Sequence, residues 1–117
     1  MNTKAQTGQE GESRAADYLV QKGVTILERN FRYKRSEIDL IVQLDSLLVF
    51  VEVKTKTNTA FGHPEIAISA QKAPKVMEGA EHYIQISNWQ GNIRFDVISI
   101  LKQKDSFEIE HFEDAFY

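Results

Sequence analysis

The sequence predicts an α/β fold in which a mixed central sheet is flanked by helices. Apolar residues recur with the helical period in residues 7–22 and 69–86. Between and after these segments, five stretches have the alternation or the β-branched composition of strands. The order is helix, three strands, helix, two strands, and the second helix can be the crossover that joins two parallel strands. Residues 1–117 have the usual length of one domain and are expected to form a single unit.

End signals bound the first helix and the strands that follow it. Thr7 and Glu10 form a capping-box pattern, and Gly23 is placed to end the helix. Asp45 and Ser46 are expected to form a tight turn between two strands. Strands are expected at residues 24–30, 37–44 and 47–54. The first helix is therefore followed by a three-stranded meander.

The second helix is expected to be capped by Ser69 and to run to about Ile86. Pro74 lies several residues inside this segment. It either kinks the first turn or moves the start of the helix downstream. Two further strands are expected at residues 92–101 and 107–112.

Composition excludes several classes of protein. The longest aliphatic or aromatic run is residues 47–51, far below the roughly 20 residues of a membrane-spanning helix, so no membrane partner is expected. Residues 1–14 are polar and lack the apolar centre of a secretion signal. The absence of cysteine removes disulfides, thiolate nucleophiles and cysteine zinc sites, and it fits a cytoplasmic location. The net charge of −3 is not that of a purely electrostatic nucleic-acid binder.

Glu52 interrupts an apolar stretch in a strand that should be well buried. A lone buried carboxylate is energetically unfavourable. Strand periodicity places Lys54 on the same face, and counting back from the turn pairs Asp39 with Glu52 across the hairpin. One interpretation is a structural ion pair of Glu52 with Lys54, with Asp39 capping the strand end. The other is a functional site built on two neighbouring carboxylates.

Glu12 lies on the apolar stripe of the first helix with Ala15 and Ala16, so its carboxylate is aimed at the sheet. It is either a first-turn acid stabilised by the helix N-terminus or a third acid of the same site. Three carboxylates without cysteine favour a hard cation, Mg²⁺ or Mn²⁺, over zinc. Such an ion binds phosphate oxygens and generates hydroxide, while a lysine stabilises negative charge at phosphorus. This chemistry is phosphodiester hydrolysis, with a catalytic set of Glu12, Asp39, Glu52 and Lys54.

A basic cluster points to nucleic acid as the partner. Four Lys or Arg residues fall within residues 29–35, interleaved with Phe31 and Tyr33, which suits a surface that follows a phosphate backbone and stacks bases. The alternative is a solvated charged loop between two strands. Lys72 either contacts a phosphate or is an ordinary surface lysine. The expected nucleic-acid-binding residues are Arg29, Arg32, Lys34, Arg35, Lys56, Lys72 and Lys75.

The remaining polar residues of note are expected to have structural roles. Arg94 and Asp96 alternate with apolar neighbours and should form a pair on a half-exposed strand. His82 and His111 have no partners at metal-ligand spacing and are interpreted as surface or core residues.

Asp39 followed by Glu52, Val53 and Lys54 has the form D…E-x-K. Further stretches accompany this motif, namely Gly11-Glu12, Tyr18-Leu19, Ile26 to Asn30, Glu37 to Ile41, Val49 to Lys54, Phe61-Gly62, Arg94 to Ile98, and His111 with Ala115-Phe116. In these residues the chain resembles the PD-(D/E)xK nuclease superfamily. It resembles a bacterial family, the YraN-like proteins, more closely still and over nearly the whole chain.

The resemblance implies a restriction-endonuclease-like αβββαβ core and metal-dependent hydrolysis of DNA. A similarity to archaeal Holliday-junction resolvases implies branched, repair or recombination intermediates as substrates, and a homodimer as one arrangement suited to two symmetric cuts. By this likeness Glu12, Asp39 and Glu52 hold Mg²⁺ or Mn²⁺, the Val53 carbonyl adds a ligand and Lys54 assists attack. The alternative is a nucleic-acid-binding module with the same fold and little or no cleavage.

Two positions depart from the family pattern. Ser36 stands where glycine is usual before Glu-Ile-Asp, a difference expected to change only a turn. The basic cluster of the second helix is reduced to Lys72 and Lys75, so fewer phosphate contacts are expected there.

Overall fold

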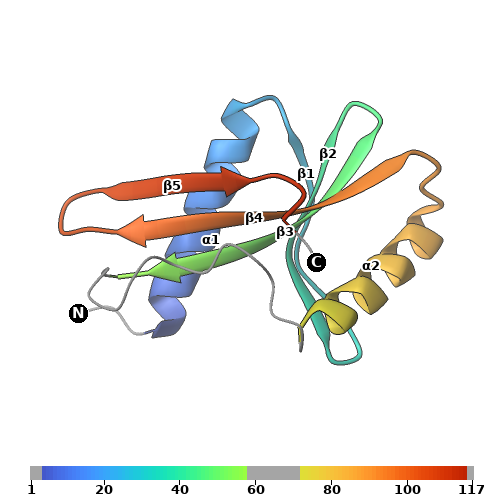
Figure 1. Ribbon diagram of the computed structural model, residues 1–117, viewed down its shortest axis with the longest axis horizontal. Coiled ribbons are helices and arrows are strands. Elements are labelled where there is room, and N and C mark those ends of the chain that lie inside the picture. The colour runs from blue at the N-terminus through green and yellow to red at the C-terminus, as the bar shows by residue number, and fades with distance from the viewer. Residues whose placement is uncertain (1–3, 58–71, 116–117) are drawn as a thin grey trace.

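The computed structural model describes residues 4–57 and 72–115, which form a sheet with a helix on either side (Figure 1). In chain order the elements are α1 (Lys4–Gln21), β1 (Thr25–Tyr33), β2 (Ser36–Leu44), β3 (Leu47–Lys56), α2 (Ala73–Ser87), β4 (Asn92–Lys102) and β5 (Phe107–Phe112). The predicted α/β class is confirmed, and the order of elements agrees with a restriction-endonuclease-like core. No helix in the described ranges is long and apolar enough to cross a membrane.

The sheet is mixed and has the strand order β1-β2-β3-β4-β5. β1, β2 and β3 form an antiparallel meander. β4 runs parallel to β3, and β5 returns antiparallel along the outer side of β4. The parallel pair is the one whose strands are separated in sequence by α2, which is the crossover that such a pair requires.

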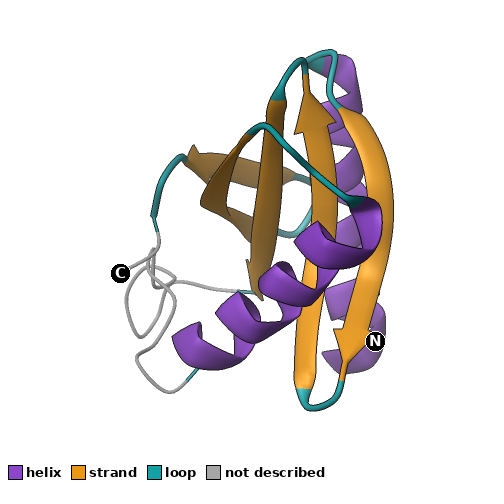
Figure 2. Cartoon of the chain, turned by 90° about the vertical axis from the view of Figure 1, so that its right-hand side faces the viewer, coloured by secondary structure: helices purple, strands orange, loops and turns teal. Residues whose placement is uncertain are grey.

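Each helix covers one face of the sheet, as Figures 1 and 2 show from two directions. α1 packs Ala15, Ala16 and Leu19 against a cluster from β2, β3 and β4. α2 packs Val76 and Ala80 against the opposite face, over side chains of β2 and β3. Removal of these two apolar faces from water supplies the main driving force for the fold.

Strand β3 alternates regularly between the two faces. Phe50 belongs to the α2-side cluster, while Val51 and Val53 contact the α1-side cluster. The alternation therefore places Glu52 and Lys54 together on the α2 side, as strand periodicity predicts.

Strand β2 changes face at Asp39. Ile38 packs in the α2-side cluster, whereas Leu40, two residues later, packs in the α1-side cluster. The β1 residue opposite this interruption is Asn30, whose φ of 52° lies in the left-handed region that asparagine tolerates. Regular strand alternation would place Ile38 on the face of Leu40 and Val42, but it does not lie there because the strand is irregular at Asp39.

The two predicted helix caps differ from the observed ones. α1 begins at Lys4, so Thr7 lies inside the helix, which continues back through the good helix formers at residues 5 and 6. The N-cap of α2 is Lys72, and Ser69 lies outside the described residues. Pro74 occupies the first turn of α2, where its missing N–H is tolerated. The helix therefore starts downstream of Ser69, which is the second of the two predicted effects of Pro74.

Strand β1 runs three residues beyond its predicted end. Phe31 contacts the α2-side cluster, and the ring of Tyr33 stacks on His82 of α2 with centroids 3.8 Å apart. These contacts extend the strand to Tyr33. Arg29 and Arg32 consequently lie on a strand and not in a loop, although both are exposed to solvent as that interpretation expected.

Ser36 affects more than a turn. It is the first residue of β2 and is buried beneath α2, where a Cβ at Gly79 would collide with the Ser36 hydroxyl. The Ser36 Oγ has no hydrogen-bond partner in the described part of the chain. A serine at this position therefore determines how closely α2 approaches the sheet.

The position of α1 depends on the close approach of Gly11 to Thr55 of β3, because a Cβ at Gly11 would collide with the Thr55 side chain. Gly11→Ala should destabilise the protein by about 1 kcal/mol or more, since the overlap exceeds the gain in helix propensity. Gly8→Ala is the matched control in the same helix, where nothing lies within 4 Å of an added Cβ. It should stabilise by about 0.5–1 kcal/mol in urea unfolding. Equal effects of the two changes would contradict this packing.

Candidate acidic site at the open end of the β2–β3 ladder

Asp39 lies where strands β2 and β3 separate. Their ladder runs from the Leu44–Leu47 pair to the Leu40–Val51 pair, and Asp39 and Glu52 are the next residues along. The Val53 N–H donates to Asp39 Oδ2 at 2.8 Å. A side-chain carboxylate thus takes the place of the backbone acceptor that a continuing ladder would supply.

Glu52 projects on the α2 side and is 7% exposed. Its Oε1 accepts a hydrogen bond from Lys72 Nζ, at the start of α2, and the two groups form an ion pair. The Lys72 side chain remains 46% exposed. A partner from α2 could not be inferred from strand periodicity, because the contact depends on where the helix begins. Lys54 is half-buried farther along the same strand.

Glu12 approaches Asp39 from α1 on the other face of the sheet. It is half-buried, and the Asn30 side chain is hydrogen-bonded to it. Glu12 and Asn30 line a cavity of about 320 Å³ together with Arg29 and Leu40. Glu12 of α1 and Glu52 of β3 are therefore both near enough to Asp39 for their charges to act on it.

The pKa values of Asp39 and Glu12 are both raised. Burial raises the pKa of Asp39 to about 7, and the charges of Glu52 and Glu12 act in the same direction against the opposing Val53 N–H and Lys72. Burial also raises the pKa of Glu12, with the charges of Glu37 and Glu52 adding to it and the Asn30 hydrogen bond opposing it. Such a cluster favours a bound proton or a bound cation, because either one relieves the repulsion.

The donor set fits a hard cation in its chemistry. Carboxylate oxygens from Glu12, Asp39 and Glu52 are the ligands that Mg²⁺ and Mn²⁺ prefer. Within residues 4–57 and 72–115, however, no three His, Cys, Asp or Glu side chains are grouped so as to hold a metal ion. Glu52 is instead engaged by the Lys72 ammonium.

Some of the predicted basic residues border the acids. Arg35, Lys72 and Lys75 line a cavity of about 300 Å³ on the α2 side, together with Asp39 and Glu37. Arg29 lines the cavity on the α1 side. The two cavities flank the opening of the ladder, so each side of the acid cluster has at least one cation beside it.

The other predicted basic residues lie apart from these cavities. Arg32 pairs with Glu37 at 3.4 Å. Lys34 Nζ lies 3.9 Å from Glu78 Oε1 of α2 and 5.2 Å from the centroid of the Tyr33 ring. Lys56 is exposed at the end of β3. The basic residues therefore form a dispersed set rather than one continuous stripe.

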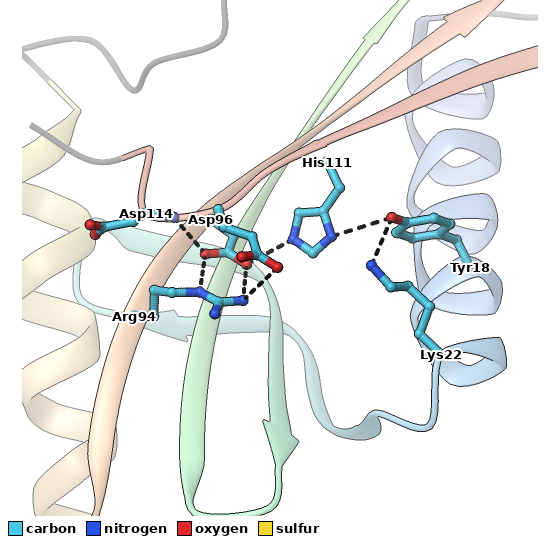
Figure 3. Close-up of polar contacts among 7 residues, drawn as sticks. Tyr18, Lys22, Arg94, Asp96, His111 and Asp114 are labelled. Atoms are coloured by element: carbon cyan, nitrogen blue, oxygen red, sulfur yellow. Dashed lines mark hydrogen bonds and ion pairs between the residues drawn. The ribbon is translucent and has the colours of Figure 1, made fainter.

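A second buried carboxylate, Asp96, lies on β4 and is fully buried (Figure 3). It accepts two hydrogen bonds of 2.8 Å from Arg94, contacts His111 Nε2 at 2.7 Å and accepts the Asp114 N–H at 3.0 Å. Burial alone would raise the pKa of Asp96, but the bonds to His111, Arg94 and Asp114 outweigh it and leave the pKa lowered. The predicted Arg94–Asp96 pair is confirmed.

His111 extends this network to α1. Its Nδ1 lies 3.5 Å from the Tyr18 hydroxyl, to which Lys22 Nζ donates at 3.1 Å (Figure 3). The network thus joins β4, β5 and α1. Sequence reasoning missed the contact between His111 and Asp96. A signal was present, because Asp96, like Glu52, is an acid within an apolar strand and therefore requires a partner.

The chain belongs to the family described as "Uncharacterised protein family UPF0102", whose profile matches residues 11–100. The predicted resemblance to YraN-like proteins is therefore confirmed. A UPF0102 protein of Flavobacterium psychrophilum is 39% identical over 110 residues, which covers 94% of this chain and 92% of the relative. Another from Thermodesulfovibrio yellowstonii is 40% identical over 114 residues, which covers 97% of this chain and 98% of the relative.

Among solved structures, the chain is similar to that titled "The structure of Pyrococcus Furiosus SfsA in complex with Ca2+". The TM-score is 0.40 and the sequence identity 12%, and the match covers 91% of this chain and 64% of that one.

The raised pKa of Asp39 predicts a pH-dependent stability. Between its ordinary value of 3.8 and about 7, the folded protein holds a proton that the unfolded chain releases, so stability falls as pH rises through this window. Asp39→Asn keeps an acceptor for the Val53 N–H but has no carboxyl to deprotonate, so the fall in stability with pH is removed. The variant should exceed the wild type by on the order of 2 kcal/mol at pH 8 and converge with it near pH 4 in urea unfolding. A difference independent of pH would contradict the raised pKa.

Asp96 should be essential for stability. Asp96→Ala leaves Arg94 and His111 without their buried acceptor and should cost about 3–5 kcal/mol in urea unfolding. Glu113→Gln is the control, because Glu113 is an exposed partner of the same arginine at 3.6 Å. Its expected cost is below about 1 kcal/mol. A small effect of Asp96→Ala would show that the network does not anchor the strands.

Proposed function

We propose that this protein is a Mg²⁺- or Mn²⁺-dependent endodeoxyribonuclease that hydrolyses phosphodiester bonds, with branched, repair or recombination intermediates as its substrate class. The observation that carries the proposal is the proximity of three acids, since burial and the charges of Glu52 and Glu12 together raise the pKa of Asp39 to about 7. The D…E-x-K pattern of Asp39, Glu52 and Lys54, which resembles that of the PD-(D/E)xK nucleases, supports this assignment.

The residues of the site divide into cation ligands and a lysine that assists attack in the proposed reaction. Glu12, Asp39 and Glu52 would hold the cation, with the Val53 carbonyl as a further ligand. When bound, the cation supplies a nucleophilic hydroxide from water and neutralises a phosphate oxygen. The Val53 N–H fixes the orientation of the Asp39 carboxylate. Lys54 assists attack by offsetting the negative charge that develops at phosphorus.

The cations of the flanking cavities would hold the nucleic acid. Arg35 and Lys75 on the α2 side and Arg29 on the α1 side border the acids. Phosphates on either side of the scissile bond would thereby be placed across the opening. The small number of such contacts predicts that binding is weak and that it falls only gradually with salt, because the salt dependence scales with the number of phosphates neutralised.

A second candidate is a nucleic-acid-binding module with the same fold and little or no cleavage. The engagement of Glu52 by Lys72 and the net charge of −3 favour it. The two candidates differ in whether Glu52 is needed for cleavage or only for local structure.

The direct test is cleavage of labelled linear, single-stranded, flapped and four-way-junction DNA with Mn²⁺ at low salt. The wild type should cut selectively, and Glu52→Gln should reduce the rate by at least about 100-fold. Glu108→Gln, an exposed acid on β5, is the matched control and should cut as the wild type does. Binding without cutting by the wild type would favour the inactive module. Cutting that persists in Glu52→Gln would exclude Glu52 from catalysis.

A further inference from the structure

Lys72 is a cation built into the acid cluster. Its ammonium contacts Glu52, and its charge also acts on Asp39. Glu52 is nearly buried, whereas the Lys72 side chain is half exposed. One partner of the ion pair is therefore fixed in the sheet, and the other can move without unpacking the core.

The position of Lys72 is unfavourable for the helix that it begins. It is the N-cap of α2, yet its side chain makes no capping hydrogen bond. Ser, Thr, Asp or Asn is preferred at an N-cap, and a positive charge is disfavoured by the helix dipole there. The contact with Glu52 compensates for this. Local rules broken in this way are expected at functional sites.

The Lys72 ammonium and a divalent cation compete for the same carboxylate. A carboxylate engaged by lysine is a poorer metal ligand, and no metal-holding group of three acids or histidines forms in the described residues. Lys72 also lines the 300 Å³ cavity that contains Arg35 and Lys75. A phosphate in this cavity would meet three cationic side chains as well as the carboxylates of Glu37 and Asp39. One of the three cations is Lys72, which holds Glu52.

We propose that Lys72 is an internal counter-ion, which holds Glu52 in the resting protein and releases it to a divalent cation when a phosphate of the nucleic acid enters this cavity. The inference rests on the proposed function and concerns its regulation. Metal and nucleic acid then bind with positive coupling, and by linkage each raises the affinity for the other by the same factor. The resting protein would bind metal weakly and would be protected from cleaving without a correctly placed phosphate.

The test is Mn²⁺ affinity measured by isothermal titration calorimetry on the full chain without nucleic acid. Lys72→Gln should bind Mn²⁺ about 10-fold more tightly than the wild type, because the competing ammonium is gone. Lys102→Gln is the matched control, since it removes the same charge from another Lys–Glu pair, formed with Glu10 at 3.0 Å. This variant should bind as the wild type does. Lys72→Met, which keeps the apolar length of the side chain, serves if Lys72→Gln is misfolded by circular dichroism.

A second titration tests the role of the phosphate, with a short single-stranded oligonucleotide present and its own Mn²⁺ binding subtracted. The oligonucleotide should raise the Mn²⁺ affinity of the wild type about 10-fold and that of Lys72→Gln much less. Equal Mn²⁺ affinity in the wild type and Lys72→Gln, with binding abolished in Glu52→Gln, would overturn the role of Lys72 and leave the proposed nuclease site intact. No Mn²⁺ binding by any variant at millimolar concentration would overturn both.

Discussion

The hydrogen bond from the Val53 N–H to the Asp39 carboxylate is the interaction on which the candidate site depends. It ends the β2–β3 ladder with a side chain instead of a backbone carbonyl, and β2 changes face at the same residue. The opening admits Glu12 from α1 on one face and leaves Glu52 beside Lys72 on the other. The carboxylates of Glu52 and Glu12 thus act on Asp39 from the two sides of this irregular point in the sheet.

Asp96 and Asp39, on strands β4 and β2 of the same sheet, have opposite environments. Asp96 pairs with Val51 across β3 and β4, one position from Glu52, and projects to the α1 side. Its donors lower its pKa, which is the property of a structural anion. Asp39 has a pKa raised by burial and by two other acids, which is typical of groups that exchange protons or bind cations. The contrast separates an anchor of the fold from the candidate acidic site.

Periodicity and turn signals were sufficient to predict the order of all the described elements. They also predicted both ends of β5, at residues 107 and 112. They failed where a local rule is overridden by tertiary contacts, as at the left-handed Asn30 and at Lys72, which caps α2 without a capping side chain. The convergence of Glu12 and Glu52 on Asp39 followed from strand pairing and the helical stripe. The Lys72 partner of Glu52 and the Tyr18 contact of His111 could not follow, because both depend on how a helix is placed against the sheet.

The central claim is that the cluster of Glu12, Asp39 and Glu52 binds a divalent cation. The most direct measurement is the melting temperature of the wild type and of Asp39→Asn with and without on the order of 10 mM Mn²⁺. Because a ligand of the folded state stabilises it by mass action, the wild type should melt higher with Mn²⁺ and Asp39→Asn should show no gain. An equal shift in both proteins, or none in the wild type, would contradict the claim.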